Sequence, residues 1–70
     1  MVEKTIELIG VSANSIEDAV QLAISRAAVT LNGIHTAQVA NVAATVENSR
    51  VVNWRVTVRL TFIVKEQLHE

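Results

Sequence analysis

The chain has 70 residues, of which 50% are apolar and 19% charged, and its net charge is −1. It contains no cysteine, which excludes disulfides, thiolate metal sites and thiol catalysis. Its few basic residues are spread along the chain rather than clustered, which excludes a typical nucleic-acid-binding surface. No apolar run approaches the roughly 20 residues that span a membrane. A chain this short buries only about 60% of its unfolded surface, so its own core is marginal. We therefore expect one domain over residues 1–70, in a soluble cytoplasmic protein that gains stability by self-association.

The first predicted elements are a strand and a helix joined by a short polar turn. The segment "VEKTIELIGV" alternates with a period of two, which predicts a strand ending near Gly10. After the turn "SANS", Ser15 is the expected N-cap, and Asp18 completes an approximate capping box. From Ile16 on, apolar residues recur at spacings of three and four, which predicts an amphipathic helix of about sixteen residues. Gly33 is the expected left-handed residue that ends this helix.

The rest of the chain predicts a hairpin of two strands. The second strand runs from about residue 34 to residue 47. Val39 and Val42 are three apart in an otherwise two-residue alternation, which predicts a bulge. The polar segment "ENSR" is typical of a hairpin turn. Residues 52–64 then alternate without a break between a dry, apolar face and a mixed face of polar and apolar residues. Trp54 falls on the dry face, where we expect it to anchor the core or an interface.

The element order is therefore β-α-β-β, which predicts an α+β fold. The last strand, residues 52–64, spans about 43 Å when extended at about 3.3 Å per residue. A compact globule of this length has a radius of gyration near about 11 Å and a diameter below about 30 Å. We therefore expect this strand to curl around the helix, to continue onto a neighbouring copy, or both. The edge strands also expose unpaired backbone groups that a neighbouring copy can cover, which predicts a homo-oligomer.

No catalytic or metal-binding constellation stands out in the sequence. The serines fall in turns or on the helix, and two glycines are too few for a phosphate-binding loop. His35 and His69 are too far apart in sequence to suggest a metal centre. Glu3 and Glu7 share a strand face and are within reach of one cation, although a solvated face is the more common role. We therefore predict no metal site and no enzymatic activity, with His35 as the one faint candidate base.

Two arginines share the mixed face of the last strand. Arg55 and Arg59 stand about 13 Å apart along the strand, so they serve different partners. Ion pairs across a subunit interface are the ordinary role for such residues. The alternative is an anion site, because guanidinium groups bind phosphate and carboxylate in a bidentate manner.

Several stretches together resemble the dodecins, and the resemblance covers about residues 4–66. They are "ELIGVS", the alanine-rich "IEDAVQLAISRAAVTL", a short link into "QV", and the closing strand "WRVTVRLTFIVKE". The resemblance implies a three-stranded antiparallel sheet wrapped around one helix, assembled into a hollow homo-dodecamer. It also implies a binding or storage role, since flavin-binding dodecins hold pairs of flavins between subunits.

The resemblance places the candidate ligand site at "IHTAQV". In flavin-binding dodecins an "L-D-W-F-E-V"-like motif begins the second strand, its tryptophan stacks on the isoalloxazine ring, and a third-strand glutamine bonds the flavin. Here His35 stands at the aspartate, Thr36 at the tryptophan and Gln38 at the glutamate, while Arg55 stands at the glutamine. These four residues form the expected ligand-binding set. Because aromatic stacking contributes about 1–3 kcal/mol per ring, we predict weak or absent flavin binding.

Three hypotheses for function remain open at this point. The leading one is a non-catalytic, hollow homo-oligomer that binds a small anionic ligand through Arg55 at the subunit interface. The alternatives are a flavin-storing dodecin despite the missing tryptophan, and a purely structural assembly whose ligand site has decayed. Dodecin-like groups without the tryptophan include some described as calcium-binding, but Ca²⁺ requires six to eight oxygen ligands, and the sequence offers no such cage.

Overall fold

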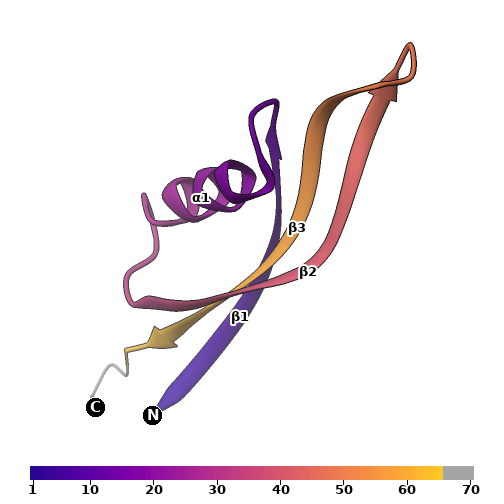
Figure 1. Cartoon of the computed structure of the whole chain (residues 1–70). Coiled ribbons are helices and arrows are strands. Elements are labelled where there is room, and N and C mark those ends of the chain that lie inside the picture. The colour runs from indigo at the N-terminus through magenta and orange to yellow at the C-terminus, as the bar shows by residue number, and fades with distance from the viewer. Residues whose placement is uncertain (66–70) are drawn as a thin grey trace.

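The computed structural model describes residues 1–65, and residues 66–70, His69 among them, lie outside the described part of the chain. Its elements are β1 (Val2–Ser12), α1 (Ile16–Ala27), β2 (Ile34–Glu47) and β3 (Arg50–Val64). The strands form one sheet in the order β1-β3-β2, and both pairings are antiparallel (Figure 1). The predicted α+β fold, a three-stranded antiparallel sheet of β-α-β-β order with one helix, is confirmed.

The helix α1 packs closely on one face of the sheet. The buried core joins alanines of the helix to larger residues of the central strand: Ala19, Ala23, Ala27, Val56, Val58 and Leu60. Gly10 of β1 lies directly beneath the helix backbone, where an added Cβ would clash with the carbonyl oxygen of Ala19. The small helix residues and this glycine therefore let the two backbones approach. The dry face predicted for the last strand is the face that α1 covers.

Ser15 caps the N-terminus of α1 as predicted. Its Oγ accepts a hydrogen bond from the backbone N–H of Asp18 at 2.9 Å. In the second hydrogen bond of a capping box, the Asp18 side chain would accept from the backbone N–H of Ser15. Here the Asp18 carboxylate instead accepts from the buried hydroxyl of Ser12 at 2.6 Å. The Ser12 hydroxyl in turn accepts from the N–H of Asn14 at 2.9 Å. The end of β1 and the start of α1 are thus tied together by one short polar network.

The prediction that α1 continues for about sixteen residues and ends at Gly33 is wrong. The helix ends at Ala27, and the N–H groups of Val29 and Thr30 bond carbonyls three residues back, at 3.3 and 3.2 Å. This tighter pattern is typical of the last turn of a helix and satisfies its free carbonyls. Gly33 does have the expected left-handed conformation, with φ of 77°, but it lies in the link to β2. Its carbonyl accepts from the N–H of Ile63 at 3.4 Å, which starts the pairing of β2 with β3.

The strand β2 is irregular at three places. The bulge predicted between Val39 and Val42 is confirmed by a register shift between Val39 and Asn41. Two further shifts, between Ile34 and Thr36 and at the end of the strand, were not predicted. The hairpin turn falls at Asn48 and Ser49, as predicted, with φ values of 52° and 63°. Positive φ at both central residues is typical of the tight turns that match the twist of a hairpin.

The described residues form an elongated body of 59 × 19 × 13 Å with a radius of gyration of 14.9 Å. Its long end is a hairpin arm, residues 45–53, where β2 and β3 extend beyond both β1 and α1 (Figure 1). Valines on this arm are exposed: Val46 by 58%, Val51 by 50% and Val52 by 36%. The predicted overhang of the last strand is confirmed. Within residues 1–65, α1 lacks the length and apolar character needed to cross a membrane.

Candidate functional site

The candidate site lies on the face of the sheet that α1 leaves uncovered. Residues that pair across the strands point to the same side of a sheet, so the register arranges this face in rows. Its rows, read from β1 through β3 to β2, are Thr5–Thr61–Thr36, Glu7–Arg59–Gln38, Ile9–Thr57–Asn41 and Val11–Arg55–Ala43. The face is thus mostly polar, with hydroxyl, amide and charged groups in adjoining rows.

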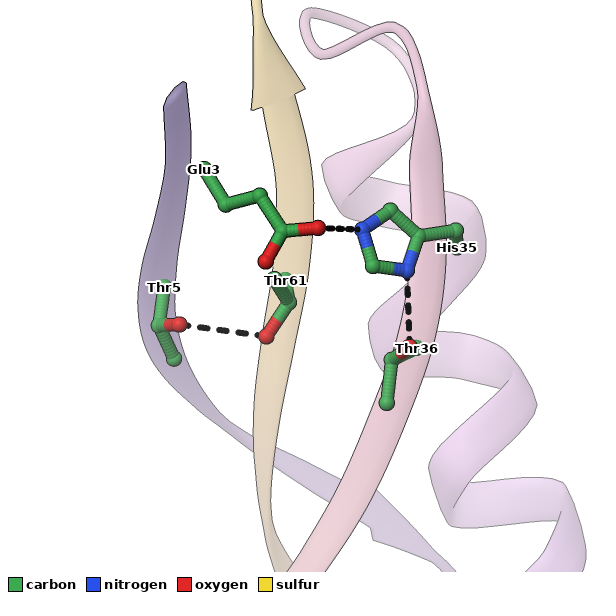
Figure 2. A network of polar contacts seen from close by, with 5 residues as sticks. All are labelled: Glu3, Thr5, His35, Thr36 and Thr61. Atoms are coloured by element: carbon green, nitrogen blue, oxygen red, sulfur yellow. Dashed lines mark hydrogen bonds and ion pairs between the residues drawn. The ribbon is translucent and has the colours of Figure 1, made fainter. Parts of the chain in front are cut away.

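At one end of this face, five residues from all three strands form a polar cluster (Figure 2). Its members are Glu3, Thr5, His35, Thr36 and Thr61. The His35 ring contacts Thr36 Oγ1 through Nδ1 at 2.7 Å and Glu3 Oε2 through Nε2 at 2.8 Å. Thr5 Oγ1 and Thr61 Oγ1 are hydrogen-bonded to each other at 3.1 Å. The ring of His35 therefore joins the two edge strands of the sheet, although it and Glu3 are 32 residues apart in the chain.

A bulge at the start of β2 brings His35 to this face. Consecutive residues of a regular strand point to opposite sides of a sheet. The register shift between Ile34 and Thr36 leaves His35 as an extra residue without a partner on β3. Bulges of this kind redirect side chains and occur frequently beside functional sites. His35 and Thr36, neighbours in sequence, can thus contact each other on one face.

Two contacts on this face join a carboxylate to a basic side chain, and both are open to solvent. The side chains of His35 and Glu3 are 39% and 44% exposed. Arg59 Nε donates to Glu7 Oε2 at 3.0 Å, in a pair about half exposed. Exposed ion pairs contribute only about 0–1 kcal/mol each, so neither determines the fold. Each of these two carboxylates contacts a basic side chain of its own, and residues 1–65 hold no group of three or more potential histidine, cysteine or carboxylate metal ligands.

The structure brings together some of the expected ligand-binding residues and separates others. His35 and Thr36 are in direct contact, and Gln38 lies on the same face, opposite Arg59. Arg55 lies four residues from Arg59 along β3, which corresponds to about 13 Å. Within one chain, Arg55 is therefore remote from the polar cluster. Among the described residues it has no ion-pair partner.

Trp54 occupies the opposite face and packs, partly buried, against the core beneath α1. It pairs with Ser12 on β1 and with Ala44 on β2. The sequence prediction of a core or interface anchor is confirmed for the core. Because it is the only tryptophan and points away from Thr36, it does not supply an aromatic ring to the polar cluster of its own chain.

Sequence reasoning did not assign Glu3, Thr5 or Thr61 to the candidate site, and it did not predict a groove that the structure contains. Strand alternation places Glu3 and Thr5 on one face, but their contacts with β2 and β3 depend on a strand order that the sequence does not reveal. The groove has a volume of about 190 Å³ and lies between β1 and α1. It is lined by Leu8, Ile9, Gly10, Val11, Leu22, Ala23 and Arg26. None of these residues belongs to the polar cluster, so the groove is a separate, largely apolar feature.

Comparison with known proteins gives consistent results. The family model described as Dodecin matches residues 2–65. The solved dodecin from Streptomyces coelicolor is 29% identical, with a TM-score of 0.89 and coverage of 94% of each chain. A mutant of the T. thermophilus dodecin is 32% identical, with a TM-score of 0.88 and coverage of 93% of this chain and 97% of the other.

A third solved structure is the calcium dodecin from Mycobacterium tuberculosis, which is described as having a novel calcium-binding site. It is 26% identical, with a TM-score of 0.82 and complete coverage of both chains. A search of functionally curated proteins gave no match. The family match over nearly the whole chain, together with the shared three-stranded sheet and single helix, shows that the chain belongs to the dodecin family.

Proposed function

We propose that this dodecin is a non-catalytic binding or storage protein that works as a hollow homo-dodecamer in the cytoplasm. The observation that carries the proposal is the hairpin arm, whose valines remain exposed in a single chain of the dodecin fold. A second copy placed over the arm would bury this surface. Burial of apolar area stabilises association by about 25 cal/mol per Å².

The proposed ligand is a small anion held between subunits by Arg55 with His35, Thr36 and Gln38. Arg55 supports this because it is exposed, always charged, and has no ion-pair partner among the described residues. Because Arg55 is remote from His35 within one chain, the four residues form a single site only if two subunits contribute to it. Flavin is a poor candidate ligand, since Thr36 offers no ring and Trp54 lies on the other face.

Native mass spectrometry of the purified protein tests the assembly. We expect one dominant species with the mass of twelve chains. A monomer or dimer at micromolar concentration would contradict the proposed function.

A thermal-shift screen of phosphates and small carboxylates tests the anion site. We expect at least one anion to raise the melting temperature of the wild type and to have no such effect on Arg55→Ala. Arg50→Ala is the matched control, because Arg50 is also exposed but lies at the hairpin turn. If no stabilisation depends on Arg55, the purely structural assembly becomes the better hypothesis.

A further inference from the structure

The polar cluster contains a hydroxyl, an imidazole and a carboxylate in series. Thr36 Oγ1 lies 2.7 Å from His35 Nδ1, and His35 Nε2 lies 2.8 Å from Glu3 Oε2. Both distances are within hydrogen-bond reach for a nucleophile, its general base and a group that orients the base. Such arrangements are recognised by geometry and roles, whatever fold carries them. The series runs across the sheet and is visible in Figure 2.

In the neutral tautomer of His35 that carries its hydrogen on Nε2, the chemistry of the three groups sets the direction of both hydrogen bonds. An ionised carboxylate only accepts, so the hydrogen in the contact with Glu3 belongs to His35 Nε2. The neutral ring then has its lone pair at Nδ1, where it accepts from the hydroxyl of Thr36. The hydroxyl hydrogen thus points toward the ring. Thr36 and His35 are both exposed in the single chain, and in the proposed assembly they line the ligand site between subunits, which a small electrophile would enter.

The other threonines of the cluster provide an internal comparison. Thr5 and Thr61 form a hydrogen bond with each other, and within residues 1–65 no imidazole is bonded to either hydroxyl. Thr36 differs from them because the bulge places the ring of its own neighbour beside it. The local backbone irregularity and the hydrogen-bond series therefore single out the same hydroxyl.

We propose that Thr36 is an acyl-acceptor site, activated by His35 and oriented through Glu3, for activated acyl esters. This activity goes beyond the proposed function and does not depend on it. Thr36 Oγ1 attacks the acyl carbonyl carbon and forms the new ester bond, while its proton passes to His35 Nδ1. The bond between the acyl carbon and the leaving oxygen then breaks, and the proton leaves with the released alcohol. The product is O-acyl-Thr36, with His35 returned to its neutral state.

The open position of the site determines the extent of the reaction. An exposed, solvated sheet face stabilises a developing oxyanion less than a preorganised and dry pocket does. We therefore expect one slow acylation per chain rather than rapid turnover. A covalently loaded chain of this kind is compatible with a storage protein.

The test is to incubate the assembled protein with p-nitrophenyl acetate and to locate the acetyl group by peptide mass spectrometry. We expect acetylation at Thr36, and none at Thr5, Thr57 or Thr61. General-base catalysis contributes about 100-fold or more, so His35→Gln should slow Thr36 acetylation by about 100-fold. Thr36→Ser should retain the reaction, whereas Glu3→Gln should slow it by a smaller factor, because its amide oxygen still accepts from Nε2.

Two results would overturn the proposal. One is acetylation confined to lysines and the N-terminus, and the other is an unchanged rate at Thr36 in His35→Gln. Circular dichroism and native mass must match the wild type for each variant, which all three positions, exposed in the single chain, should allow. The assembly and anion experiments above are independent of this outcome.

Discussion

Two glycines illustrate how single residues act for different physical reasons. Gly10 is needed for space, because the backbone of α1 passes directly over it. Gly33 is needed for its backbone conformation, since φ is 77° and the nearest atoms to an added Cβ are 3.7 Å away. The first is a packing constraint and the second a conformational one.

Alanine substitutions separate these two effects. Gly10→Ala should lower the free energy of unfolding by about 3 kcal/mol, at the upper end of overpacking costs, because the helix must move away from β1. Gly33→Ala should cost only about 1–2 kcal/mol, the strain of a left-handed residue with a side chain. Urea denaturation at a fixed chain concentration measures both. Equal losses, or a larger loss for Gly33→Ala, would contradict this account.

Thr36 is also the position where an aromatic ring would alter ligand choice. Thr36→Trp should strengthen FMN binding by about 1–3 kcal/mol, or roughly 5- to 150-fold, through stacking on the flavin ring. Quenching of FMN fluorescence on titration measures the affinity. Asn41→Trp, on the same strand and face, is the matched control and should leave binding weak. Stoichiometric quenching by the wild type at micromolar FMN would show that the ring is unnecessary.

The strands and the helix show which structural features the sequence patterns are sufficient to predict. The bulge near Val39 could be predicted because Val42, Ala44 and Val46 keep a spacing of two, which makes the extra residue between Val39 and Val42 visible. The bulge at His35 could not, since it lies at the first residues of β2, where no preceding alternation sets a reference. The end of α1 was overestimated because Leu31 continues the helical spacing, although the chain there already follows a tighter turn. The contact of His35 with Glu3 requires the order β1-β3-β2, which the periodicity of separate segments does not contain.

The hairpin turn offers a test of β2 and β3. Ser49 has φ of 63°, a conformation that is strained for any residue with a side chain. Ser49→Gly should stabilise the protein by about 0.5–1 kcal/mol, since Asn-Gly is the preferred pair for such turns. Thermal unfolding followed by circular dichroism measures the gain. Ser49→Ala keeps the strain and should give no gain, so an equal effect of both substitutions would refute the explanation.

The elongated shape of the described chain arises because β1 and α1 extend along only part of the β2–β3 hairpin. The helix and β1 cover only part of β3, and the hairpin arm continues alone. The length of the last strand made this overhang predictable. The partner of the arm was not predictable in the same way, because a single chain contains only one side of an interface.

A charge on the arm tests its role in assembly. Val46→Asp should shift native mass spectra toward smaller species, because it places a carboxylate on apolar surface that the assembly is proposed to bury. Val2→Asp is the control, since Val2 is 50% exposed but lies at the other end of the sheet. Circular dichroism checks that both variants fold. An unchanged twelve-chain species for Val46→Asp would remove the arm from the interface.

The order of the strands also affects how the chain folds while the ribosome synthesises it. The central strand, β3, follows both of its neighbours in sequence, so neither β1 nor β2 has a strand partner until it emerges. The β2–β3 hairpin can close at once, because its strands are joined by a two-residue turn. The pairing of β1 with β3 joins residues as far apart as Val2 and Val64, and contacts of such separation form slowly. During translation, therefore, β1 waits as an unpaired strand for nearly the whole synthesis of its own sheet.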